Sequence, residues 1–315
     1  DLKKGSLETD IKSLKKAARQ TIGPELEKRI QNIIDTGLVE LSNDFKIYWN
    51  KFVIAKLMPG NDYLNPNFEL IVDDMLEQNQ RKKLYEFLDK FIKNKVNTIL
   101  ESLIDLKNLK DKNSSIKALA YQLYENNGVL KRENVSEYLK VLGQNERKIL
   151  RDLGVKFGRY HVFLYKLIKP EPVLLRTLLW KNFHQKYFNL TPPTFGLNFI
   201  EDKDNRNKNF MLLCGFEKFD NYFVRIDILE RLFKQIINSN SDENKEIKLV
   251  SEMLNLLGCS KDNFKKLIQK MNYKIYEKKE DLYFRYMPKK NFKKTDKKKP
   301  VKENPFGILK NLELS

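Results

Sequence analysis

The chain has 315 residues, of which 41% are hydrophobic, and it carries a formal net charge of +18 at neutral pH. This apolar content excludes a wholly disordered chain, and the length allows two or three domains. The sequence contains no apolar run of the ~20 residues that a membrane span needs, no secretory signal, and too few cysteines for a disulfide framework or a thiolate metal site. We therefore expect a globular protein in a reducing, cytoplasmic compartment.

The first 113 residues are predicted to form a helical domain with one hairpin. Residues 7–36 place apolar side chains at helical spacing, whereas residues 45–57 change to strand-like composition on either side of positions 50–51. From 79 to 109 we expect one long helix that spans roughly 45 Å. Its buried stripe is predicted to comprise Leu84, Leu88, Phe91, Val96, Ile99, Leu103 and Leu106.

Residues 114–200 are predicted to form a helical, winged-helix-like basic domain. Three short helices between 115 and 154 each end near a glycine, and an extended run rich in aromatic and branched residues follows at 155–165. The next helix, at 173–183, is apolar nearly all round, which is typical of a helix inside a core.

Residues 201–287 are predicted to hold a polar linker and a C-terminal winged-helix-like domain. An amphipathic helix is expected at 226–237, and residues 249–286 then follow the order helix, turn, helix, hairpin. The Lys-rich residues 288–315 are expected to be disordered. The predicted fold class is therefore mainly α with small antiparallel β elements.

Positive charge is unevenly distributed along the chain. Residues 114–200 carry a net +8 and residues 288–315 a net +6, whereas the remaining segments, 1–113 and 201–287, carry +2 each. This asymmetry favours a polyanionic partner. An AT-rich genome, which enriches lysine, is the alternative, but it does not explain the scarcity of acidic residues in 114–200.

Two basic helices, one in each winged-helix-like domain, are the candidate nucleic-acid surfaces. Lysine suits phosphate contacts better than bidentate base recognition, so we expect contact that tolerates sequence differences. A solvated face and a protein-packing face are the respective alternatives for the middle and the C-terminal helix. The candidate nucleic-acid-binding residues are Arg147, Lys148, Arg151, Lys156, Arg159, Lys166, Lys169, Lys261, Lys265, Lys266 and Lys270.

No constellation of residues indicates a catalytic or metal site. His161 and His184, the two histidines, lack Cys, Asp or Glu partners at metal-ligand spacing, so a structural role is expected for both. Tyr160, His161 and Phe163 have two interpretations, stacking on unpaired bases or core packing, and core packing is favoured for alternate members. No phosphate-binding glycine loop is present, so this chain alone should not hydrolyse a nucleotide.

Four groups of segments form a series along the chain. They are Lys117–Leu130 (KALAYQLYENNGVL); Leu153–Leu164 (LGVKFGRYHVFL) with Leu167–Pro170 and Leu175–Trp180; Cys214–Phe216 with Val224–Leu232; and Leu256–Ser260 with Phe264 and Asn304–Phe306. In order and spacing this series resembles the C-terminal region of alphaproteobacterial DExH-type, superfamily-two ATP-dependent helicases. That family is itself similar to the mitochondrial RNA-degradation helicase.

The resemblance implies an ATP-driven motor that precedes Asp1 in a longer protein, with ATP and Mg bound only by that motor. No catalytic residue carries over, because the motor's motifs have no counterpart here. The implied role is an accessory region that holds RNA or DNA phosphates for the motor, without a membrane partner. If roughly six to ten phosphates are contacted, affinity should fall by about 10³ or more from 50 to 200 mM salt. The alternative is a scaffold that packs on the motor or recruits a partner protein.

Overall fold

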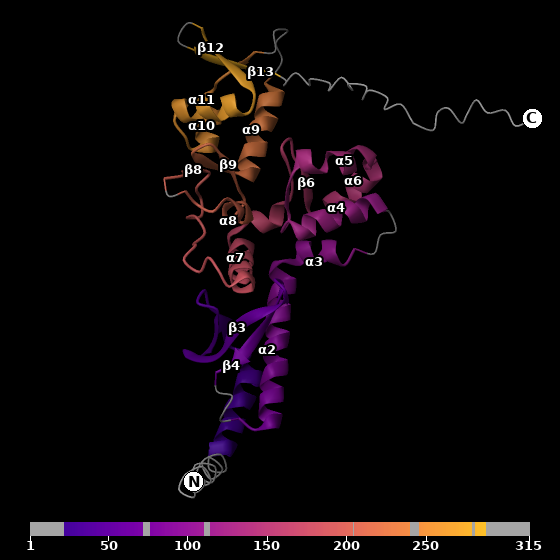
Figure 1. Cartoon of the computed structure of the whole chain (residues 1–315), viewed down its shortest axis with the longest axis vertical. Helices are drawn as coiled ribbons and strands as arrows, with labels where there is room; N and C mark the ends of the chain where they lie inside the picture. The colour runs from indigo at the N-terminus through magenta and orange to yellow at the C-terminus, as the bar shows by residue number, and fades with distance from the viewer. Residues whose placement is uncertain are drawn as a thin grey trace, which may run out of the picture. The chain divides into compact units, whose positions relative to one another are not determined.

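The computed structural model describes residues 22–71, 76–109, 114–203, 205–239, 246–278 and 281–287. The described residues fall into two compact units, one running to Asn238 and including Ser251–Cys259, the other made of Ser239–Val250 and the residues from Ser260 onward. Helices combine with small antiparallel sheets, as predicted (Figure 1). The predicted Lys-rich tail lies outside the described residues.

The larger unit begins with a helix over residues 22–36 and a four-stranded antiparallel sheet. The sheet has the order β1 (Val39–Leu41), β2 (Lys46–Trp49), β3 (Phe52–Asp62), β4 (Asn65–Leu70). The predicted hairpin is confirmed, with Asn50 and Lys51 both at positive φ, 44° and 73°. A Cβ on Gly60 would lie 1.8 Å from the carbonyl oxygen of Asn65, so only glycine fits where β3 meets β4.

The predicted single helix over 79–109 is two helices, α2 (Gln78–Ile99) and α3 (Glu101–Lys107). Leu100 leaves helical geometry between them, at φ −105° and ψ 23°, and its side chain is fully buried. Of the predicted stripe, Phe91 and Ile99 are only half-buried, and Ile92 is buried on α2 beside the remaining members. The break directs α3 onto α4.

The next module follows the predicted order of three helices. Its elements are α4 (Ser114–Glu125), β5 (Val129–Lys131), η2 (Arg132–Val135), α5 (Ser136–Val141), α6 (Gln144–Asp152), β6 (Val155–Phe157), β7 (His161–Leu164) and η3 (Tyr165–Ile168). The predicted extended run 155–165 is wrong as one strand, because a turn at 158–160 folds it into the antiparallel hairpin β6–β7. The unpredicted strand β5 pairs with β7, giving the sheet order β5-β7-β6.

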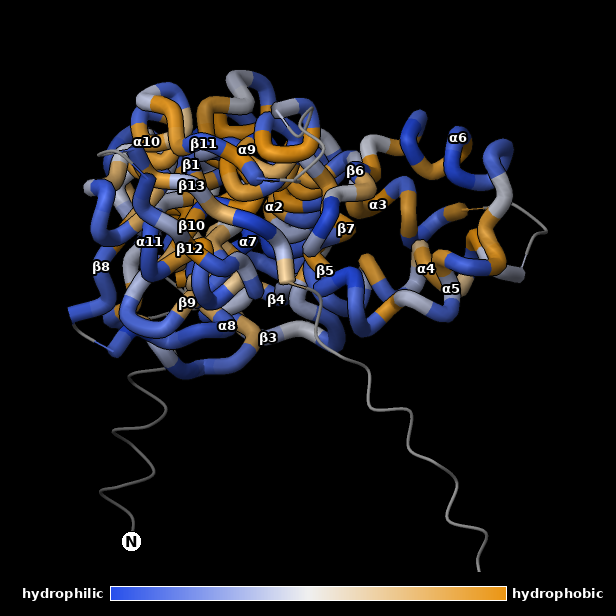
Figure 2. The backbone as a smooth tube through the Cα atoms, turned by 90° about the horizontal axis from the view of Figure 1, so that it is seen from above, coloured by the Kyte–Doolittle hydropathy of each residue, from blue (hydrophilic) through white to orange (hydrophobic). Residues whose placement is uncertain are grey.

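The chain then forms a further small sheet between two longer helices. The elements are α7 (Pro170–His184), β8 (Phe199–Glu201), α8 (Lys208–Leu213), β9 (Phe216–Phe219), β10 (Tyr222–Arg225) and α9 (Ile226–Asn238). The sheet order is β8-β10-β9. As predicted, α7 is buried on most sides. Helix α6 differs, because most of its residues are hydrophilic and only Leu150 is buried (Figure 2). The predicted linker at 201–209 includes the ends of β8 and α8.

In the part of the chain that the structure describes, the smaller unit has a three-stranded antiparallel sheet and one helix. Its elements are β11 (Ile247–Lys248), α11 (Lys261–Lys270), β12 (Tyr273–Lys278) and β13 (Asp281–Tyr286), and the sheet order is β11-β13-β12. The hydroxyl of Ser260 caps α11 by accepting the N–H of Asn263. The preceding helix, α10 (Ser251–Leu257), belongs to the larger unit and packs on α9.

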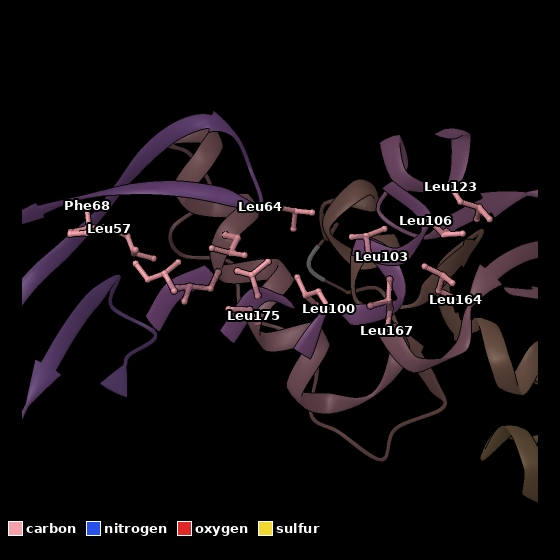
Figure 3. Packing of buried hydrophobic residues seen from close by; sticks show 14 of the residues in the cluster. Leu57, Leu64, Phe68, Leu100, Leu103, Leu106, Leu123, Leu164, Leu167 and Leu175 are labelled. Carbon is pink, nitrogen blue, oxygen red and sulfur yellow. The ribbon is translucent and has the colours of Figure 1, made fainter. Parts of the chain in front are cut away.

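One hydrophobic core joins the first sheet of the larger unit to its middle module. Leucines from β3, the α2–α3 break, α3, β7 and α7 meet in it, as Figure 3 shows for Leu57, Leu100, Leu103, Leu164 and Leu175. Because these side chains come from distant parts of the sequence, the core fixes how the surrounding helices and hairpins are placed.

A fully buried arginine donates hydrogen bonds to three backbone carbonyls in the interior of this unit. The guanidinium of Arg176, on α7, donates to the carbonyl oxygens of Asn127, Leu167 and Leu213 at 2.5, 2.6 and 3.0 Å. Burial lowers the pKa of Arg176 to about 10, which still leaves it protonated at neutral pH. Carbonyls at the end of a helix have no partner within that helix. Arg176 supplies the missing donor and so links the chain at the ends of α4, η3 and α8.

Candidate nucleic-acid interface

A basic cleft of about 680 Å³ lies between α9 and the β6–β7 hairpin of the larger unit. Its positive charge comes from the end of α6, the hairpin and α9. The cationic side chains that line it are Arg151, Lys156, Arg159, Arg231 and Lys234. Cations from three elements thus surround one open space, which is the arrangement that a phosphate chain requires.

Both carboxylates that line the cleft are engaged by other groups of the protein. Asp227 accepts two hydrogen bonds from the guanidinium of Arg225, at 2.7 and 3.1 Å. Glu230 accepts the backbone N–H groups of residues 159–161, two of them at 2.9 Å. Since these contacts offset the acidic charge locally, the five cations leave the cleft with a net positive character.

Four cations of the cleft are exposed and form no ion pair with any residue that the structure describes: Arg151, Lys156, Arg231 and Lys234. The guanidinium of Arg151 lies over the ring of Phe157, 5.7 Å from its centroid, which restrains the side chain without neutralising it. These charges are therefore available to an anionic ligand.

The cations of α9 follow from the amphipathic pattern of that helix. Leu232, Phe233 and Ile236 are buried, so Arg231 and Lys234, three positions apart, share the outer face. Reasoning from the sequence missed both, because α9 was assigned to the C-terminal domain and not to the basic middle segment. The signal that identifies them is a pair of cations at helical spacing opposite a strong apolar stripe.

Arg147 does not share the exposed face predicted for it. It is half-buried, and its guanidinium donates to the carbonyl oxygens of Leu139 and Leu142 at 2.7 and 3.2 Å, where α5 ends. Lys148 and Lys169 are exposed but do not line the cleft. Arg147, which was predicted to contact phosphate, thus donates to two backbone carbonyls instead.

Two further candidates form ion pairs within the protein. Lys166 lies 3.0 Å from a carboxylate oxygen of Glu101, and Lys265, in the smaller unit, lies 2.7 Å from one of Glu277. Exposed pairs of this kind are weak, so a phosphate can compete for the lysines. The other candidates of α11, all exposed, are Lys261, Lys266 and Lys270.

A buried histidine, His161, contacts Glu230, one of the two carboxylates of the cleft. Nε2 of His161 is 3.2 Å from Glu217, and its Nδ1 is 3.4 Å from Glu230, while Lys131 pairs with Glu217 at 2.7 Å. These glutamates lie 56 and 69 residues along the chain, so no local spacing revealed them. The network joins β5, β7, β9 and α9.

The glutamates determine the charge of this histidine. Burial alone would lower the pKa of His161, but the carboxylates of Glu217 and Glu230 outweigh it and hold that pKa above its ordinary value. Burial alone would raise the pKa of Glu217, but hydrogen bonds from His161 and Lys131 hold it below the usual range. The arrangement therefore favours an imidazolium between carboxylates.

The rings of Tyr160, His161 and Phe163 contact other parts of the protein, although Tyr160 is only half-buried. His161 and Phe163 are buried, and the ring of Tyr160 contacts that of Phe233 with centroids 4.3 Å apart. Core packing, which was favoured for alternate members of this strand, accounts for His161 and Phe163. Neither ring is accessible to an unpaired base.

Comparison of the chain with protein-family models, curated proteins and solved structures found no significant match. Across the described ranges, no helix combines the length and apolar character required to cross a bilayer. Within the same residues, no group of three His, Cys, Asp or Glu side chains is placed to hold a metal ion.

Proposed function

We propose that this chain is a nucleic-acid-binding accessory region of an ATP-dependent helicase, and that its basic cleft holds the phosphates of an RNA or DNA strand for the motor. The observation that carries the proposal is the pairing pattern in the cleft. Its two carboxylates are engaged by Arg225 and by backbone N–H groups, whereas four of its cations are exposed. A polyanion is the ligand class that such a surface attracts.

The proposal includes winged-helix-like modules as the framework of the surface. In each of the sheets β5-β7-β6, β8-β10-β9 and β11-β13-β12, a single strand is followed along the chain by helical residues and then by a hairpin. The last strand of the hairpin pairs with the single strand each time. This order is that of a winged variant of the helix-turn-helix, in which β6–β7 would be the wing beside the cleft.

The number of cations in the cleft determines the expected salt dependence of binding. Four or five phosphates on a single strand give a slope of about −3 in a plot of log affinity against log salt. For the cleft alone, in the chain shortened by residues 288–315, affinity should then fall about 50- to 100-fold between 50 and 200 mM salt. This is less than the sequence-based figure, because the structure gathers fewer cations in one place.

Fluorescence anisotropy of labelled single-stranded RNA, single-stranded DNA and duplexes tests the proposal across a salt series. The double variant R231E/K234E should weaken single-strand binding at least about tenfold and reduce the salt slope by about 1.4. The matched control is K28E/K90E, which makes the same charge change at two exposed lysines of the larger unit outside the cleft. Equal losses in both variants, or no loss in either, would show that the cleft is not the binding site.

A further inference from the structure

A second cleft of the larger unit, of about 790 Å³, has several aromatic side chains in its wall. It lies among the β3–β4 turn, α3, α4 and α7. The aromatic rings in its wall are Tyr63, Tyr121, Tyr124, Trp180 and Phe183. A volume of this order is that of a typical small-ligand site.

Two of these rings are exposed to solvent, although aromatic rings of this kind are usually buried. Tyr121 on α4 is 59% exposed and Phe183 on α7 is 36% exposed. Trp180 is half-buried and is stacked on Tyr187, with centroids 5.2 Å apart and planes inclined by 18°. Rings from two helices thus line one space, and the exposed rings of Tyr121 and Phe183 can contact a flat, aromatic ligand.

The same wall contains buried polar atoms that lack a partner. Neither the hydroxyl of Tyr63 nor the side-chain carbonyl oxygen of Asn127 has a hydrogen-bond partner among the described residues. Burial raises the pKa of Tyr63, so its hydroxyl stays protonated and can donate at neutral pH. The backbone oxygen of Asn127 accepts from Arg176, which fixes this residue in place. Unpaired buried polar groups are costly, and because both atoms are covered here, a ligand with a polar edge would satisfy them only after the wall shifts to uncover them.

Two lysines and two carboxylates, Asp62 and the exposed Glu125, line this cleft, so its charge favours a phosphate at one point only. Lys107 is already paired with Asp62 at 2.8 Å and lies 5.1 Å from the ring centroid of Tyr124. Lys117 on α4 is exposed and forms no ion pair within the part of the chain that the structure describes. It is the cation that remains for an anionic group of the ligand.

We propose that this cleft takes an unstacked nucleobase of a single strand, with the base against Tyr121 and Phe183 and its phosphate toward Lys117. The base's polar edge would lie toward the unpaired atoms of Tyr63 and Asn127 and would meet them once a shift of the wall uncovers them. A nucleobase combines a flat π face, a hydrogen-bonding edge and an attached phosphate, and the cleft offers a group for each. The inference rests on the proposed function, since it names the part of the strand that this second site recognises.

The chain contains its own reporter for this site. Trp180 lines the cleft, and Trp49 is the second of two tryptophans, so W49F leaves Trp180 as the single source of indole fluorescence. This variant of the full chain is titrated with a short single-stranded RNA, with an abasic strand of equal length and charge, and with adenosine monophosphate. Anisotropy of labelled strands measures binding in parallel.

The RNA should quench Trp180 saturably, and the abasic strand should bind at least about fivefold more weakly without quenching. Y121A/F183A should reduce affinity for RNA to that for the abasic strand and leave abasic binding unchanged. Both side chains are exposed, so circular dichroism should report an intact fold. The control Y138A removes an exposed ring outside the cleft and should leave every titration unchanged.

The outcomes separate this inference from the function on which it rests. If RNA and abasic strands bind equally and Trp180 does not respond, the nucleobase cleft is wrong while phosphate binding stands. If no strand binds but adenosine monophosphate quenches Trp180 saturably, the cleft stands and the proposed function fails. If no ligand binds or quenches, both are wrong.

Discussion

At the scale of single residues, His161 and His184 have different environments. His184 is exposed, whereas His161 is buried between two glutamates from β9 and α9. The sequence predicted a structural role for both, and the contacts of His161 are consistent with that role. Nothing in the sequence indicated that His161 would lie between two carboxylates that favour its protonated, charged form.

The raised pKa of His161 predicts a pH-dependent stability. A raised folded-state pKa contributes stability that is complete below the unfolded value of about 6.5 and is lost as pH rises through the folded pKa. The lowered pKa of Glu217 contributes stability that is complete above about 4.5 and is lost as pH falls through its folded pKa. The network should therefore stabilise the protein most between about pH 4.5 and 6.5.

Urea unfolding at several pH values tests this prediction. The free energy of unfolding of the native chain should fall between pH 6 and 8.5, and H161Q should flatten that dependence. H184Q, the control at the exposed histidine, should retain it. A native-like slope in H161Q would mean that another group titrates.

At the scale of elements, Arg176 joins the ends of α4, η3 and α8 through three carbonyl oxygens. R176M should lower the free energy of unfolding by about 3 kcal/mol or more, because it leaves these buried acceptors unpaired. R176K should recover only part of this loss, since an ammonium lacks the planar fork of a guanidinium. Urea denaturation followed by circular dichroism measures both.

The control for Arg176 is R29M, at an exposed arginine that pairs with Glu25. It should change stability by no more than about 0.5 kcal/mol. If R176M were as stable as R29M, the three carbonyl contacts would have no net structural value.

The success of sequence reasoning differed between elements for physical reasons. Helix α9 was predicted because its apolar positions repeat at helical spacing over several turns, and α7 because its long apolar run follows a proline that starts a helix. The strands β5 and β11, with three and two residues, are too short to show any period. The break at Leu100 was missed because no Gly or Pro marks it and the apolar stripe continues across it.

At the scale of the whole molecule, the charge distribution predicts how the tail and the folded part share binding. Deleting residues 288–315 removes a net +6. Affinity for single-stranded RNA should fall about tenfold or more at 50 mM salt, and the difference should shrink as salt rises toward 300 mM. Anisotropy of the full chain and the shortened chain measures this. Loss of binding at every salt concentration would assign the interaction to the tail instead of the cleft.

The candidate site was predictable from the sequence only in part. The basic excess of residues 114–200 pointed to the hairpin that supplies Lys156 and Arg159. The helix that completes the cleft lies beyond that segment, and the engagement of Glu230 by backbone N–H groups depends on long-range folding. Net charge along a chain cannot show which acids are already paired, and that pairing determines the character of the cleft.

The course of the chain between the two units has a practical consequence. It passes into the smaller unit after Asn238, returns to the larger one for Ser251–Cys259, and leaves again at Ser260. A protease cut after Asn238 would divide the chain into two pieces, which would stay associated through the packing of α10 on α9 and not through the backbone. Truncation after Asn238 would also remove α10, which packs on α9, and expose apolar surface there. Excising the smaller unit as an independent fragment therefore requires a short linker in place of Ser251–Cys259, whereas the larger unit must keep α10 and needs a linker in place of Ser239–Val250.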